Sequence, residues 1–167
     1  GNSLTLSGQN VNLIEKIVPT IQSDLAINTA NTQASITLSE SVFKSDKSTT
    51  LTNSELALTM TGGAATLSSN TLAVTNSNKT FTYTLTLDGT TPNGSEELRI
   101  QGTVYDAAGN SLDVNEFIFL NDKLAPAIEK AFNISSDNSE ASITFSEPVF
   151  KADGSTELTT NELALTI

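Results

Sequence analysis

The chain repeats itself at a distance of 107 residues. Residues 34–44 read ASITLSESVFK and residues 141–151 read ASITFSEPVFK, so that 151 − 44 gives the period of 107. When residues 13–60 are aligned with residues 120–167 without a gap, 25 of the 48 positions are identical. Self-similarity at domain length predicts tandem copies of one domain, and it argues against a single fold that uses the whole chain once.

The phase of this repeat predicts how the chain divides into domains. Residues 1–4 match residues 109–112, which lie near the end of a copy. We therefore expect residues 1–16 to be the C-terminal tail of a preceding repeat, residues 17–121 to be a complete repeat, and residues 122–167 to be the N-terminal part of the next. A unit of this length is large enough to bury one small core.

Apolar and polar residues alternate along most of the chain, as in residues 81–87 (FTYTLTL) and 98–105 (LRIQGTVY). A period of two is typical of strands with one buried face, and turn sequences such as Asp88-Gly89 separate the alternating segments. We therefore predict an all-β fold of immunoglobulin-like antiparallel β-sandwich repeats with very little helix. The strands expected in the complete unit are 20–28, 33–40, 55–61, 64–68, 71–75, 79–88, 96–105 and 112–120.

A polar segment, residues 41–54, separates the second and third expected strands. Thr52 and Glu55 have the spacing of a helical capping box, but we favour a loop over a short helical turn. Lys44 follows an apolar Val-Phe pair that recurs before Lys151. We interpret it as a solvated lysine; the alternative, an isopeptide cross-link to an asparagine, requires a buried acid beside the pair.

The composition argues against catalysis. The chain has no Cys, His or Trp, so it lacks the residues of Ser-His-Asp and Cys-His catalytic sites and of strong zinc sites. It also lacks the glycine motifs that bind phosphates and dinucleotides. Glu96 and Glu97 are adjacent on an expected strand and so point to opposite faces; we interpret them as solvated residues rather than as an acid/base pair. We therefore expect no enzymatic activity.

The charge of the chain excludes further partners. It carries 8 basic and 19 acidic residues, a net charge of −11, without a basic stripe. We therefore expect no nucleic-acid binding and little attraction to anionic membranes. No apolar run approaches the roughly 18 residues that span a bilayer, so we also expect no direct membrane insertion.

Acidic and amide side chains gather at one expected end of the sandwich. Alternating strand directions bring Glu40, after the second strand, close to Asp106 and Asn110 in the last hairpin and to the incoming linker around Glu15. Calcium takes about six to eight oxygen ligands, often from separate loops, so these residues would supply part of a calcium site. Alternatively, Asp106 and Asn110 serve only their own turn, and Glu40 is a surface residue or accepts hydrogen bonds from the linker.

The next junction carries a matching set of residues. Asn121, Asp122 and Glu147 occupy the corresponding places there, and they are the other candidate calcium ligands. Each linker ends in a proline, at Pro19 and Pro126. Because proline restricts its own φ angle and the conformation of the residue before it, we expect short, semi-rigid junctions.

Three segments resemble the bacterial immunoglobulin-like repeats of surface-layer proteins and large adhesins. They are the Pro-x-Ile opening at residues 126–128, ASITFSEPV at residues 141–149 and VYDAAGN at residues 104–110. In addition, LNDKLAP at residues 120–126 is similar to a cadherin-type linker, in which Asn and Asp near a proline bind calcium between domains. The resemblance implies an exported, modular and non-enzymatic protein outside the cell or at its surface.

These observations together predict a structural or adhesive segment of a large exported surface or filament protein, which stacks its units into a stalk or fibre. The expected partners are neighbouring repeats of the same chain or of another copy, together with a cell-surface or extracellular ligand. Residues 125–167 lack counterparts of residues 61–108, so we expect other sequence or a neighbouring chain to complete them. The alternative is a module that binds a carbohydrate or a protein, although we expect the nine Phe and Tyr residues to lie mostly in the core.

Overall fold

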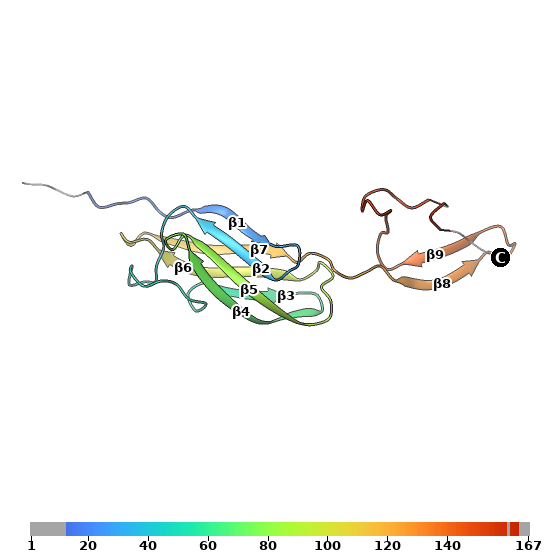
Figure 1. The fold of residues 1–167 in the computed structure, drawn as a ribbon, viewed down its shortest axis with the longest axis horizontal. Helices are drawn as coiled ribbons and strands as arrows, with labels where there is room; N and C mark the ends of the chain where they lie inside the picture. Colours follow the sequence, from blue (N-terminus) through green and yellow to red (C-terminus); the bar gives the residue numbers. More distant parts are fainter. Residues whose placement is uncertain (1–12, 160, 164–167) are drawn as a thin grey trace, which may run out of the picture. The chain divides into compact units, whose positions relative to one another are not determined.

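In the part of the chain that the structure describes, residues 13–159 and 161–163 of a computed structural model, every regular element is a β-strand (Figure 1). The all-β class predicted from the alternation is therefore confirmed. The chain divides into two units, Gly1–Lys123 and Leu124–Ile167, and most of the expected N-terminal tail, residues 1–12, lies outside the described residues. No helix among those residues is long and apolar enough to cross a membrane.

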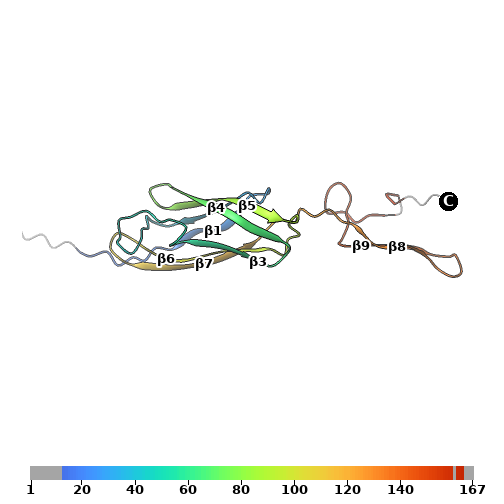
Figure 2. The same ribbon diagram turned by 90° about the horizontal axis from the view of Figure 1, so that it is seen from below.

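The first unit consists of two antiparallel sheets. One has the strand order β1-β2-β5-β4 and the other β3-β6-β7. Figure 2 shows them as two layers, with β4 and β5 on one side and β3, β6 and β7 on the other. The strands are β1 (Ile21–Ile27), β2 (Gln33–Leu38), β3 (Ala57–Thr61), β4 (Ala65–Thr75), β5 (Thr80–Gly89), β6 (Glu97–Tyr105) and β7 (Ser111–Phe119).

The inward-facing residues of both sheets form one hydrophobic core. In β5, Phe81 and Tyr83 are fully buried while Thr84 between Tyr83 and Leu85 is exposed, and from the other sheet Leu98 and Ile100 are also fully buried. Burial of one such large side chain contributes roughly 1.5–3 kcal/mol to folding. The Tyr83 hydroxyl donates a hydrogen bond to the Leu56 carbonyl at 2.7 Å. The two sheets therefore pack face to face through this core, as in a β-sandwich.

The prediction of two short strands at 64–68 and 71–75 is wrong, because both segments belong to the single strand β4. Its pairing with β5 runs from Ala65↔Gly89 to Thr75↔Thr80, with one irregularity between Leu67 and Ser69. A bulge absorbs one extra residue within a continuous ladder. Ser69 and Asn70, which lie between the two predicted strands and are residue types that favour turns, are therefore inside a strand.

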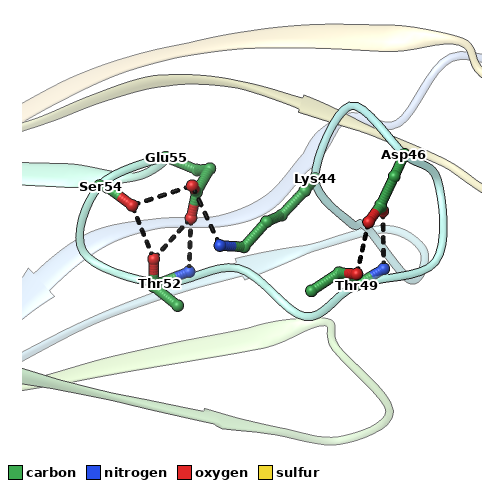
Figure 3. Close-up of polar contacts among 6 residues, drawn as sticks. All are labelled: Lys44, Asp46, Thr49, Thr52, Ser54 and Glu55. Atoms are coloured by element: carbon green, nitrogen blue, oxygen red, sulfur yellow. Dashed lines mark hydrogen bonds and ion pairs between the residues drawn. The ribbon is translucent and has the colours of Figure 1, made fainter.

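The loop between β2 and β3 contains no helix, as we expected, and side-chain hydrogen bonds hold it in place (Figure 3). Glu55 accepts hydrogen bonds from the Thr52 backbone N–H at 2.9 Å and from the Thr52 hydroxyl at 2.6 Å. These bonds lower the pKa of Glu55 to about 2. Asp46 likewise accepts hydrogen bonds from the backbone N–H and the hydroxyl of Thr49, which lower the pKa of Asp46 to about 2.

Lys44 crosses this loop and forms an ion pair with Glu55, with Nζ 3.1 Å from Oε1 (Figure 3). Both side chains are about one-quarter exposed. The partner is an ionised glutamate at the surface, so the arrangement does not match the buried lysine, asparagine and acid that an isopeptide bond requires. The interpretation of Lys44 as a surface lysine beside a core segment agrees with this geometry.

The second unit contains β8 (Ile128–Ile134) and β9 (Ala141–Phe145), which form a two-stranded antiparallel sheet. The loop after β9 repeats the contacts of the loop after β2. Residue pairs 107 positions further along the chain make the same interactions: Lys151 Nζ with Glu162 Oε1 at 3.0 Å, Asp153 Oδ1 with Thr156 N at 2.9 Å, and Thr159 N with Glu162 Oε2 at 2.8 Å.

Candidate functional site

Three carboxylates meet where the linker enters the first unit. Glu15 lies in the linker, Glu40 follows β2, and Asp106 begins the turn between β6 and β7. One carboxylate oxygen from each lies within 4.8 Å of the others. The antiparallel order of the strands thus brings together three segments that are far apart in the sequence, and we call this cluster the acidic pole.

Asp106 is buried and organises the β6–β7 turn. Its Oδ1 accepts hydrogen bonds from the backbone N–H of Gly109 at 2.6 Å and of Asn110 at 2.7 Å, and its Oδ2 accepts one from the Asn110 side chain at 2.7 Å. Burial raises the pKa of Asp106, but these hydrogen bonds outweigh it and hold the pKa below its ordinary value. Asp106 therefore serves its own turn, whatever else it binds.

Asn110 connects this turn to the incoming linker. Its side-chain amide donates a hydrogen bond to the Ile17 carbonyl at 3.0 Å and approaches the Glu15 carbonyl at 3.5 Å. The linker residues Glu15 and Ile17 are themselves exposed, so few apolar contacts fix their path. The amide of Asn110 therefore helps to position this exposed linker segment.

Glu40 is the residue of the acidic pole whose pKa is raised. Burial raises its pKa above the ordinary value, and the charges of Asp106 and Glu15 raise it further, while Lys79 partly offsets them. Like charges held this close favour either a bound proton or a bound cation. A bound proton or a bound cation would each relieve the repulsion among these three carboxylates.

The acidic pole fits a calcium ion only in part. It offers three carboxylates, whereas calcium takes about six to eight oxygen ligands. Both oxygens of Asp106 already accept hydrogen bonds, and the side-chain amide N–H groups of Asn110 donate to Asp106 and to the linker. Calcium binding here stays a prediction.

The candidate ligand Asn121 takes part in a different interaction. Its backbone N–H and side-chain amide donate to Asn31 Oδ1 at 2.9 and 2.8 Å, and Asn31 Nδ2 donates to the Asn121 carbonyl at 2.7 Å. Asn31 is buried and has a φ of 57°, a left-handed conformation that Asn adopts more readily than most residues. This pair joins the β1–β2 turn to the end of β7, and sequence reasoning missed it because the two residues are far apart in the chain.

The other two candidate calcium ligands at this junction, Asp122 and Glu147, belong to different units. Asp122 is exposed and lies beside Gly94 in the first unit. Glu147 is half-buried in the second unit, and its Oε1 is buried without a hydrogen-bond partner among the described residues.

The interpretation of Glu96 as a solvated residue is wrong, because its side chain is fully buried. Its Oε1 accepts hydrogen bonds from the backbone N–H groups of Ala64 at 3.2 Å and Ala65 at 3.3 Å, and its Oε2 accepts one from Asn93 at 3.1 Å. Burial raises the pKa of Glu96, but these bonds outweigh it and lower the pKa overall. A Cβ on Gly63, whose φ is +58°, would lie 2.1 Å from Glu96 Oε1, so only glycine fits there.

The expectation that most aromatic residues lie in the core is also wrong. Phe81 and Tyr83 are buried, whereas Phe117 and Phe119 are 50% and 51% exposed on β7. Their ring centroids lie 6.0 Å apart, and the Arg99 guanidinium lies 5.0 Å from the Phe117 centroid. Alternation on β7 turns Val114 inward and these two rings outward. We call Arg99, Phe117 and Phe119 the aromatic patch.

Comparisons of this chain with known protein families, with curated proteins and with solved structures give no match. The residues and contacts described above are therefore the basis for a proposed function.

We expect Glu96→Gln to lower the free energy of unfolding by about 2–3 kcal/mol at neutral pH, because an amide N–H₂ would replace a charged acceptor that faces backbone donors. The lowered pKa of Glu96 means that its contribution is present above pH 4.5, its unfolded value, and is lost as the pH falls through the folded value. Urea unfolding followed by circular dichroism measures both effects. Glu97→Gln is the matched control and should cost under about 1 kcal/mol, because Glu97 pairs with Arg99 at the surface; equal losses in the two variants would contradict a special role for Glu96.

We expect Glu40→Gln to raise the free energy of unfolding at pH 7, by a few tenths to about 1 kcal/mol. The folded pKa of Glu40 is raised, so the wild-type protein binds more protons folded than unfolded in the window between 4.5 and that raised value. Its stability therefore falls as the pH rises through the window, and the advantage of the variant should disappear as the pH is lowered toward 4.5. An advantage that does not depend on pH would contradict repulsion as its cause.

The same two proteins test calcium binding when they are melted in a chelator and in millimolar calcium. If calcium binds at the acidic pole, it should raise the melting temperature of the wild-type protein and raise that of Glu40→Gln less. Identical melting temperatures of the wild-type protein in the two solutions would contradict calcium binding at the acidic pole.

Proposed function

We propose that this chain is a structural or adhesive segment of a large exported surface or filament protein, in which immunoglobulin-like units stack into a stalk or fibre. The observation that carries the proposal is the recurrence of the same loop contacts in two units, at residues 107 positions apart. Repeating the same domain lengthens the protein and sets the spacing of its units, but it adds no new kind of binding or catalytic site. This role requires no catalytic group.

The topology of the first unit supports the immunoglobulin-like part of the proposal. Constant-type immunoglobulin domains pair their seven strands in the orders A-B-E-D and C-F-G. When β1 to β7 are lettered in chain order, the observed orders β1-β2-β5-β4 and β3-β6-β7 correspond to these strand for strand. The connections between sheets follow the same correspondence.

The contacts at the acidic pole support a role in joining units. Asn110 holds the carbonyl of Ile17, and Pro19, which follows in the linker, is buried against the unit. A linker tied by a hydrogen bond and a proline transmits orientation better than a flexible tether. Joined in this way, successive units would form a semi-rigid array whose partners are neighbouring repeats.

The composition supports a location outside the cell. The chain has no cysteine, and Thr, Ser and Asn together supply 61 of its 167 residues. Such residues suit strands and exposed turns. The net charge of −11 keeps repeated units apart in solution and favours solubility of a long array.

A stiff junction is the property to test, and the absence of native cysteine makes site-directed spin labelling straightforward. We expect labels at Ser68→Cys and Ser142→Cys, which replace exposed residues of the two units, to give a narrow distance distribution by pulsed electron paramagnetic resonance. The matched control carries the same labels with Pro126→Gly and a short Gly/Ser insertion beside it, which should broaden the distribution. Equal widths in the two proteins would contradict a stalk built from semi-rigid junctions.

The aromatic patch favours the alternative function, a module that binds carbohydrate. Two exposed rings beside a guanidinium offer apolar faces and hydrogen-bond donors together, which is the combination that a sugar ring requires. If this function holds, the protein binds to at least one polysaccharide on a glycan array. The double variant Phe117→Ala, Phe119→Ala should then weaken that binding at least about tenfold. Phe132→Ala, which removes an exposed ring from the second unit, is the control. A chain that retains no glycan, or a control that weakens binding equally, would contradict the alternative.

A further inference from the structure

The second unit exposes apolar residues whose counterparts in the first unit are buried. Phe132 is 48% exposed, whereas Leu25, 107 positions earlier, is 5% exposed. Leu163 is 45% exposed, whereas its counterpart Leu56 is fully buried. In the first unit these positions belong to a core that includes Tyr83 from β5. Among the described residues, the second unit therefore exposes one half of such a core.

The backbone of the second unit shows the same open side. In the first unit, Leu38 N donates to the Lys79 carbonyl at 2.9 Å, next to the ladder between β2 and β5. The counterpart of Leu38 is Phe145 on β9, and among the described residues β9 pairs only with β8. An edge with free donors and acceptors accepts a further strand.

A second strand position is open in the same way. Phe43 exchanges backbone hydrogen bonds with Tyr105 of β6, at 2.7 and 3.1 Å. Its counterpart Phe150 instead forms an isolated bridge to Glu157, within its own loop. The partner that Phe43 finds in β6 is thus replaced by a local contact.

A charge is also left without its counterpart. Glu40 lies near Lys79, whose charge lowers its pKa, and Lys79 Nζ donates to the Ser39 carbonyl at 3.3 Å. Glu147, the counterpart of Glu40, has a buried Oε1 without a partner among the residues that the structure describes. In the first unit, residues 61–121 supply both Asp106, whose charge raises the pKa of Glu40, and Lys79, whose charge lowers it.

We propose that the open face of the second unit binds a segment with the sequence of residues 61–121 of this same chain, in the register that β4 to β7 have in the first unit. In the first unit, residues 61–121 help to bury the apolar face, pair with the second edge of β2 and pair with Phe43. Among the described residues, the corresponding apolar face is exposed, β9 pairs only with β8, and Phe150 pairs only within its own loop. This inference goes beyond the proposed function, because it concerns which sequence closes the second unit and not what an array of units does.

Closure of the second unit would place bulkier side chains in its core than the first unit has. Two counterparts are bulkier in the second unit, since Phe132 stands where the first unit has Leu25, and Phe145 where it has Leu38. Larger side chains in a packed core force shifts of neighbouring side chains and backbone, which lower the stability of the closed unit. The closed second unit is therefore less stable than the first, and unfolds at lower urea.

The experiment compares the 167-residue chain with an extended chain in which a second copy of residues 61–121 follows Ile167, the counterpart of Met60. Amide hydrogen exchange by nuclear magnetic resonance reports on Phe145 N, whose counterpart is bonded in the first unit. We expect its protection to rise by roughly 100-fold or more in the extended chain, together with a second unfolding transition.

Two substitutions on β9 distinguish specific binding of the added segment to the second unit from nonspecific hydrophobic association. Ile143→Asp alters the counterpart of the buried Ile36 and should abolish the gain in protection, whereas Thr144→Asp alters the counterpart of Thr37 on the outer face and should keep it. If the extended chain is insoluble, a separate polypeptide of residues 61–121 added to the original chain provides the same measurement. No gain in protection in either format, or a gain that survives Ile143→Asp, would overturn the proposal.

Discussion

The structure depends on one constraint: each of its sheets is apolar on one face and has to cover that face with another sheet. In the first unit, β5 supplies Phe81 and Tyr83 from one side, and β6 supplies Leu98 and Ile100 from the other. The burial of these side chains is the dominant favourable term in folding. The second unit has the same kind of face on β8 and β9 without a facing sheet among the described residues, so its apolar residues remain exposed.

The ends of the sandwich are held by polar groups rather than by the core. Asp106, Glu96 and Asn31 are buried, and each satisfies backbone groups of a turn that the sheets leave unpaired. Buried backbone groups without partners are costly, so side chains of this kind decide how the loops close. At the acidic pole, three acids also converge, with one carboxylate oxygen from each within 4.8 Å of the others.

Much of the fold follows from local pattern, and the errors have physical causes. The alternation around Phe81 indicated β5 almost to the residue, because its inward-facing residues Phe81, Tyr83 and Leu85 are buried. It failed at Ser69, where a bulge continues the strand through a turn-like sequence. It also failed at Glu96, since alternation cannot reveal that distant backbone donors surround a carboxylate, and at Phe117, since the face of an edge strand depends on what covers it.

The sequence by itself determined the strand-forming segments, the 107-residue period and the absence of the residues that most catalytic sites use, because these are properties of neighbouring residues and of composition. The expected strand order also brought Glu15, Glu40 and Asp106 to one end of the sandwich, where the structure has them. Only the tertiary structure decided that Asn31 forms hydrogen bonds with Asn121, that Glu96 is buried, and which aromatic rings face solvent. Each of these depends on how the chain returns to itself over tens of residues. The repeat that first marked the chain as modular also identifies, position by position, what the second unit leaves uncovered.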